Sequence, residues 1–197
     1  MSTVSKVILV VVALIVVSFG VAFMTSHYLV SKLDGTGGNK APQEEQGQGE
    51  LYSSEDGFSF FYPSDYELSS RTESAGGSQW DALVLLPKGY VPPQGGEGPP
   101  AITVSVFSNP EGLSLESWVK KDDRSNWKLA ADPNGLQSIT VGGEPALAYR
   151  HSGLYETEAV AVAHSGKIFL FEGGWLTPQD KIVADFQNLV RTIYFTQ

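Results

Sequence analysis

Three histidines, His27, His151 and His164, are the side chains in this sequence that could act as a general base near neutral pH. No two of them have the i, i+4 or His-x-His spacing that brings two imidazoles to one metal ion. His151 and His164 each stand beside a Ser-Gly pair at the end of an expected strand. If residues 146–151 and 156–164 pair as a hairpin, these two histidines lie at opposite ends of it and do not converge.

Paired carboxylates are the next candidates for chemistry. His151 with Glu156 or Glu158 is the combination that could hold a divalent cation, but polar residues at the edge of a turn are the simpler interpretation. Asp122 and Asp123 are expected on the polar face of a helix. We therefore predict no catalytic residue, no metal ligand and no cofactor.

Serine and glycine motifs do not indicate an enzyme either. No serine stands in a Gly-x-Ser-x-Gly elbow, and His164 and Ser165 are adjacent, which does not suit a catalytic triad. The glycines within residues 95–98 lie in a Pro-rich loop rather than between a strand and a helix, so a phosphate-binding loop is not indicated. An anchored extracytoplasmic hydrolase that uses His151 or His164 is the alternative hypothesis to a binding protein.

Aromatic residues near the expected strand ends could form a binding surface. Trp175 follows two glycines and precedes a helix start, and it could line a ligand groove with Tyr90 and Tyr155. Aromatic side chains at such positions also act as lids on a core, which is the alternative interpretation. Tyr90, Tyr155 and Trp175 are the candidate groove residues.

The N-terminal region has the pattern of a membrane anchor. Residues 7–24 form an uncharged apolar run, which at about 1.5 Å per helical residue crosses a hydrocarbon core of about 30 Å. A cleavable signal peptide is the alternative, but its apolar core is shorter, about 7–15 residues. We predict a tail at residues 1–6 and a transmembrane signal anchor at residues 7–30 of a single-pass cell-membrane protein. Lys6 favours a cytoplasmic N-terminus and an extracytoplasmic C-terminal domain.

The composition changes after the anchor. Residues 31–50 are rich in Gly, Gln and Glu and predict a flexible linker, whereas residues 51–197 are long enough for one domain with one core. The chain has 13 Lys and Arg residues against 22 Asp and Glu residues, a net charge of −9. This acidic balance argues against nucleic acid as a partner. The bilayer and an unidentified envelope protein or ligand are the expected partners.

The domain alternates short strand patterns with glycine turns. Strands are expected at residues 58–62, 80–86, 101–107, 137–141, 146–150, 156–164 and 167–172, and residues 193–195 could form a last one. Ser114 is expected to cap a helix that runs to about Ser125, and Thr177 with Pro178 to begin a second, amphipathic helix. The pattern predicts an α+β fold, with an antiparallel sheet of about six or seven strands flanked by helices.

The order of these elements resembles the PsbP-like domain family, and above all its bacterial anchored or secreted members. The resemblance covers nearly all of residues 51–197. It is carried by Gly57-Phe58-Ser59-Phe60 with Tyr62-Pro63, by the helix start at residues 113–119, by the hairpin at residues 139–146, and by residues 157–169 and 186–195.

The resemblance implies an α/β/α sandwich around an antiparallel sheet and a non-catalytic accessory or binding role. Photosystem members of the family stabilise a manganese–calcium centre with a basic N-terminal segment. The matching region of this chain is the acidic linker at residues 31–50, so that role is not expected here. We therefore expect a membrane-tethered module that presents its fold to an envelope partner or ligand.

Overall fold

The computed structural model describes residues 49–75, 77–90, 99–130, 132 and 135–196. All of them belong to the second of two units into which the chain divides, residues 37–197. The predicted tail, the predicted anchor and residues 31–48 of the predicted linker lie outside the described residues. Within the described part, no helix combines the length and the apolar character that crossing a bilayer requires.

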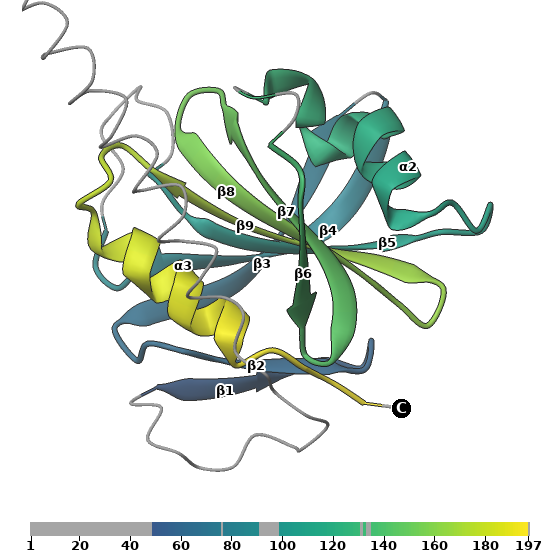
Figure 1. Ribbon diagram of the computed structural model, residues 1–197. Coiled ribbons are helices and arrows are strands. Elements are labelled where there is room, and N and C mark those ends of the chain that lie inside the picture. The colour runs from purple at the N-terminus through teal and green to yellow at the C-terminus, as the bar shows by residue number, and fades with distance from the viewer. Residues whose placement is uncertain (1–48, 76, 91–98, 131, 133–134, 197) are drawn as a thin grey trace, which may run out of the picture. The chain divides into compact units, whose positions relative to one another are not determined.

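A seven-stranded antiparallel sheet is the central element of the domain (Figure 1). In spatial order its strands are β3 (Tyr66–Ala75), β4 (Ser78–Pro87), β5 (Ile102–Ser108), β9 (Lys167–Trp175), β8 (Glu156–His164), β7 (Glu144–Ser152) and β6 (Gln137–Val141). Gly142 and Gly143, between β6 and β7, have φ values of 59° and 84°, a conformation that glycine adopts without steric cost. The predicted Gly-Gly hairpin turn is confirmed.

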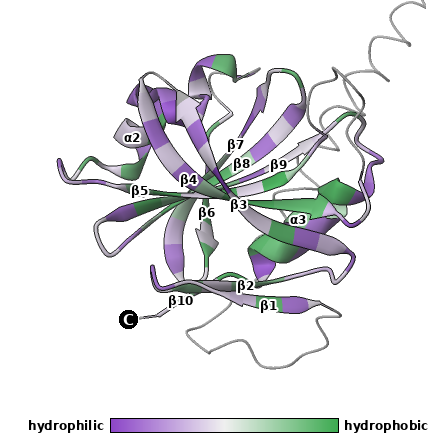
Figure 2. Cartoon of the chain, turned by 180° about the vertical axis from the view of Figure 1, so that it is seen from behind, coloured by the Kyte–Doolittle hydropathy of each residue, from purple (hydrophilic) through white to green (hydrophobic). Residues whose placement is uncertain are grey.

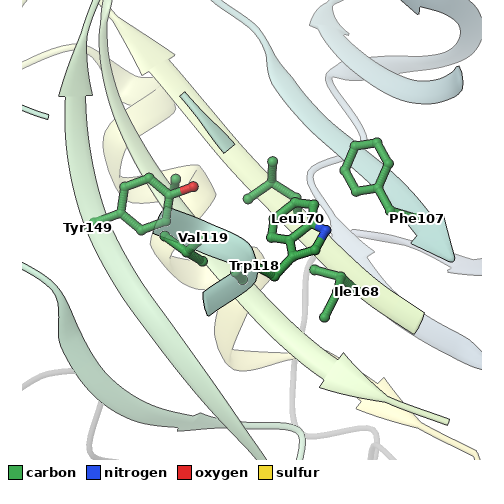
Figure 3. Packing of buried hydrophobic residues seen from close by; sticks show 8 residues of the cluster. Phe107, Trp118, Val119, Tyr149, Ile168 and Leu170 are labelled. Carbon is green, nitrogen blue, oxygen red and sulfur yellow. The ribbon is translucent and has the colours of Figure 1, made fainter. Parts of the chain in front are cut away.

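Helix α2 (Leu115–Lys121) covers one face of this sheet, which we call the α2 face. The Ser114 hydroxyl caps the helix by accepting a hydrogen bond from the Ser117 backbone N–H (3.2 Å), as the sequence predicts. Trp118 and Val119 of α2 belong to one buried apolar cluster with Leu170 and other residues of β5, β7, β8 and β9 (Figure 3). Burial of this helix face against the sheet holds α2 in place.

The opposite face, the α3 face, is covered by helix α3 (Lys181–Arg191) and by a second, three-stranded sheet. That sheet has the order β1 (Glu50–Ser53), β2 (Phe58–Tyr62) and β10 (Tyr194–Phe195). The Phe58 ring lies edge-on to Phe169 and Phe171 of β9, with centroids 5.2 and 6.0 Å apart. Figure 2 shows hydrophobic and hydrophilic residues alternating along α3, as expected for a helix with one face on a core.

This architecture agrees with the predicted α+β class, but the second helix begins later than expected. The helix α3 starts at Lys181 rather than at Thr177. The Asp180 carboxylate accepts hydrogen bonds from the backbone N–H groups of Leu176 and Thr177 (2.9 Å each) and from the Thr177 hydroxyl (2.6 Å). These bonds hold residues 176–180 in a turn, so Thr177 does not cap the helix.

Other boundaries also differ. The helix α2 stops at Lys121, and the chain continues as two 3₁₀ helices, η1 (Asp123–Ser125) and η2 (Trp127–Leu129). The Asp122 carboxylate caps η1 by accepting a hydrogen bond from the Arg124 backbone N–H (3.0 Å). The strands β1 and β3 were not predicted, because their sequences lack a clear apolar alternation.

Gly173 of β9 lies directly against helix α3. A Cβ added at Gly173 would lie 2.5 Å from Cγ of the buried Phe186 ring, whereas one added at Gly174 would lie 3.6 Å from its nearest neighbour, the Tyr155 Cβ. We expect Gly173→Ala to lower the free energy of unfolding by about 1–3 kcal/mol because the packed ring must move. The matched control, Gly174→Ala, should change it by less than about 0.5 kcal/mol. Urea unfolding followed by tryptophan fluorescence measures both; equal effects would contradict this packing.

Candidate functional site

The polar side chains singled out by the sequence gather mainly at one end of the seven-stranded sheet. Strand register places at this end the residues Tyr66, Pro87, Ile102, Ser152, Glu156 and Trp175. Lys88 forms an ion pair with Glu50 (3.5 Å), so β1 also begins here. We call this end the Glu50 end, and the other end, which carries the Ser165-Gly166 turn, the Ser165 end.

A buried carboxylate lies on the α3 face near the Glu50 end. Glu158 of β8 is directly opposite Arg150 of β7, and their side chains form an ion pair with an Oε2–Nη2 distance of 3.6 Å. The Glu158 side chain is 7% exposed and the Arg150 side chain 44%. The Arg150 guanidinium also lies over the Trp175 ring, 5.6 Å from its centroid. This contact orients the arginine between a carboxylate and an aromatic face.

Electrostatics at this site favour the neutral form of the carboxyl. Burial raises the pKa of Glu158, and the positive charge of Arg150 and the Gln187 side chain partly oppose that shift. Oε2 of Glu158 has no hydrogen-bond partner. When it is ionised, the carboxylate is stabilised first by the charge of Arg150 and then by the Gln187 side chain.

A second polar group occupies the α2 face, one residue further along the same pair of strands. Nε2 of His151 is 3.0 Å from Oε1 of Glu172, while Nδ1 is buried without a hydrogen-bond partner. The neighbouring Tyr149 hydroxyl donates to the Ser125 carbonyl (2.6 Å), and burial, followed by the charge of Glu172, raises the tyrosine pKa. His151 is thus a buried histidine oriented by a carboxylate.

A third group joins β3 to α3 at the Glu50 end. The Tyr66 hydroxyl donates a hydrogen bond to the buried Asp185 (2.8 Å), and Lys181 donates to the same carboxylate oxygen (2.7 Å). Burial and the hydrogen bond to Asp185 raise the pKa of Tyr66. Lys181 also pairs with Asp65 (3.2 Å), which follows Pro63 in the turn before β3.

The structure does not bring together the cation ligands considered from the sequence. His151 lies opposite Thr157 on the α2 face, whereas Glu158 lies on the α3 face, and Glu156 accepts a hydrogen bond from Ser152. Among the described residues, no group of three or more His, Cys, Asp or Glu side chains could hold a metal ion. The cation site of His151 with Glu156 or Glu158 is therefore not formed.

The two described histidines lie apart, as the hairpin pairing predicts. His164 is at the Ser165 end, where Nδ1 is 2.9 Å from the Glu144 carboxylate and Nε2 is 3.1 Å from the Thr196 carbonyl. Both ring nitrogens of His164 therefore have partners within the protein. For the alternative hydrolase, His151 supplies a histidine oriented by Glu172, and its Nδ1 would have to reach a nucleophile.

The three aromatic residues of the predicted groove all lie at the Glu50 end, in different surroundings. Trp175 is 4% exposed beneath Arg150 on the α3 face, whereas Tyr90 is exposed. Tyr155 is half-buried. Its Cβ would be 3.6 Å from a Cβ added to Gly174 on the α2 face. The groove of Tyr90, Tyr155 and Trp175 therefore stays a prediction.

Sequence reasoning missed the partners of the histidine and of the buried carboxylate. Glu172 follows Ile168 and Leu170 at the strand period of two, so its place on an otherwise apolar face was a signal that it needs a polar partner. Arg150 opposite Glu158 was a second signal, since oppositely charged residues often pair across antiparallel strands.

Because of the Arg150–Glu158 pair, we expect the free energy of unfolding to depend on pH. Because the folded pKa of Glu158 is raised above 4.5, its ionisation in the folded protein costs stability as pH rises through that folded pKa. Arg150→Ala should lower the free energy of unfolding at pH 7 by about 1–3 kcal/mol, because any ionised Glu158 then lacks its charged partner. The loss should be smaller at pH 4, because the raised pKa of Glu158 favours the neutral carboxyl group there, and a neutral group has no charge for Arg150 to stabilise.

A double-mutant cycle isolates this effect. In a Glu158→Gln background, Arg150→Ala should cost less at pH 7 than in the unmodified chain. Urea unfolding at both pH values measures all four variants. An Arg150→Ala cost that is the same at pH 4, at pH 7 and in the Gln background would assign the role of Arg150 to its packing on Trp175 alone.

Comparisons with known proteins bear on the fold. No protein-family model and no curated protein matches this chain. A crystal structure from Bacteroides thetaiotaomicron VPI-5482 is 12% identical with a TM-score of 0.49; the match covers 76% of this chain and about half (49%) of that one. The solution structure of cyanobacterial PsbP (CyanoP) from Synechocystis sp. PCC 6803 is 14% identical with a TM-score of 0.50, covering 79% of this chain and 98% of CyanoP. The similarity to CyanoP supports a PsbP-like fold for this domain, as the sequence resemblance predicts.

Proposed function

We propose that this chain is a single-pass membrane protein whose PsbP-like domain is a non-catalytic binding or accessory module outside the cytoplasm. The observation that carries the proposal is the sequence of parts: an uncharged apolar run at residues 7–24, a polar linker, and a domain that begins with β1 at Glu50. Such an arrangement presents a folded module at a membrane surface.

The described side chains support binding over turnover by what they already do. Arg150 pairs with Glu158, His151 with Glu172, and Asp185 with Tyr66 and Lys181. Each pair joins two elements of the fold across a strand register or a helix–sheet contact. The side chains that could most readily act as acids or bases therefore form contacts within the domain.

The linker sets how far the module can act from its anchor. For residues 34–49, which precede β1, a flexible chain would have a root-mean-square reach of about 20–25 Å. Within that radius the domain meets membrane-bound partners at a high effective concentration, so modest affinity is enough for an accessory role.

Topology is the first test of the proposal, and the chain is well suited to it because it has no cysteine. We expect a single cysteine in Glu111→Cys to react with a membrane-impermeant maleimide in intact cells. A cysteine in Ser2→Cys should react only after the membrane is opened, because the N-terminus is cytoplasmic. The reverse labelling pattern, or recovery of the full chain in the soluble fraction, would contradict the proposal.

The accessory role predicts a partner that depends on the anchor. An amine-reactive cross-linker applied to membranes that contain the full chain should yield a defined adduct. The same chain without residues 7–30, exported by a cleavable signal, should yield much less of it, because the partner is no longer at high effective concentration. Absence of any adduct from the anchored chain would argue against a protein partner.

A further inference from the structure

In the part of the domain that the structure describes, the exposed large apolar residues lie at one end. Among the described residues, the large apolar side chains with between 39% and 67% of their surface exposed are Leu51, Tyr90, Leu129, Leu154 and Leu176. They come from five separate elements or connections. Neighbouring exposed apolar side chains on a soluble domain indicate an interaction surface more often than isolated ones do.

The topology gathers three of these side chains around the β7–β8 turn. Leu154 lies in that turn, and Leu176 directly follows Trp175, which pairs with Glu156 at the first residue of β8. A Cβ placed on Gly153 would be 3.9 Å from the Leu129 Cδ1, so η2 brings a third leucine to the same turn. Leu154 and Leu176 are the most exposed of the set.

The other two side chains lie where the N-terminal segment enters the domain. Leu51 follows Glu50, and Glu50 pairs with Lys88 (3.5 Å), two residues before Tyr90. The backbone positions of all five residues therefore lie at the Glu50 end, where the β7–β8 turn, the β9–α3 connection and the start of β1 share one side of the domain (Figure 1). We call these five residues the apolar end.

We propose that the apolar end rests on the bilayer to which the chain is anchored, with Leu154 and Leu176 inserted among the lipid headgroups and upper acyl chains. The inference rests on the proposed function, because it needs the anchor at residues 7–30. The described chain begins at Gly49, two residues before Leu51, so a tether to the anchor would draw this end of the domain, and not the Ser165 end, toward the membrane.

Charge does not explain the contact, because the lysines at this end already have acidic partners. Lys88 pairs with Glu50 and Lys181 with Asp65 and Asp185, and Lys128 of η2 pairs with Asp123. The apolar end therefore offers leucines and a tyrosine rather than a positive patch. Insertion of apolar loop tips, with tyrosine at the interface, should occur on uncharged phosphatidylcholine and resist added salt.

The opposite end offers a matched control surface. The turn at residues 109–112 contacts the Ser165-Gly166 turn through the Asn109 N–H and the Gly166 carbonyl (3.0 Å), and it carries the exposed Glu111. A probe at Glu111 is attached to the same rigid sheet but at the Ser165 end. It should stay in water whenever the apolar end is on the bilayer.

The experiment uses the full chain in phosphatidylcholine nanodiscs, with fewer chains than discs. Nitroxide labels are placed singly at Leu154→Cys, Leu176→Cys and Glu111→Cys, and their collisions with oxygen and with a water-soluble nickel chelate are measured. We expect the labels at positions 154 and 176 to lose access to the nickel chelate and gain access to oxygen, relative to position 111. Added salt should leave this difference unchanged.

A second variant tests whether the leucines act together. With the label at position 176, Leu154→Ser should restore access to the nickel chelate, whereas the exposed control Glu111→Ser should not. Persistence of the protected label in Leu154→Ser would overturn a shared bilayer contact. Spin–spin broadening that grows with chain concentration would instead assign the surface to a second copy and overturn the proposal.

Failure of this inference is separable from failure of the proposed function. A chain that does not co-elute with the nanodiscs lacks the anchor, and the proposed function is then wrong. A chain that co-elutes while its labels at positions 154, 176 and 111 are equally open to the nickel chelate keeps the anchor and refutes the bilayer contact.

Discussion

Burial of β9 on both faces is the constraint on which the rest of the structure depends. Ile168 and Leu170 face α2, Phe169 and Phe171 face the small sheet, and none is more than 1% exposed. A strand in this position needs a cover on each side. One cover, α2, is local to the middle of the chain. The other combines β2 from the beginning of the domain with α3 and β10 from its end, so the fold closes only when both ends meet over β9.

The sequence predicted the parts of this arrangement that depend on local pattern. Alternation and glycine turns identified the β6–β9 strands, and Ser114 identified the start of α2. Strand β3 was not predicted because its residues, YELSSRTESA, are mostly polar. Its place at the edge of the sheet requires little burial. The start of α3 was misplaced because Asp180, rather than Thr177, satisfies the backbone N–H groups before the helix. Local signals compete at such a boundary, and the tertiary structure decides between them.

The candidate site could not be predicted in full, because it depends on contacts between residues far apart in the sequence. The hairpin register placed His151 away from His164, but the pairing of His151 with Glu172 depends on β9 lying beside β8. Similarly, Asp185 contacts Tyr66 across 119 residues of sequence, most of the length of the domain. Such buried polar contacts add little net stability when complete, yet they are costly when one partner is missing. They therefore disfavour shifted strand registers, in which Glu158 or Glu172 would be buried without a partner. This role in specifying the register accounts for polar groups on both faces of strands that are otherwise apolar.

The boundary between linker and domain follows from the same aromatic core. Tyr52 of β1 lies 5.9 Å from Phe58 and 5.2 Å from Phe60, ring centroid to ring centroid, and β1 pairs with β2 from Glu50 onward. The first aromatic side chain after the polar linker is thus the first that packs against the fold. The strand pairing of β1 and these ring contacts hold its first residue in place. The domain therefore begins at a fixed position at the Glu50 end. For the membrane contact proposed above, the start of the fold at β1 would thus also set which end of the domain lies next to the proposed anchor.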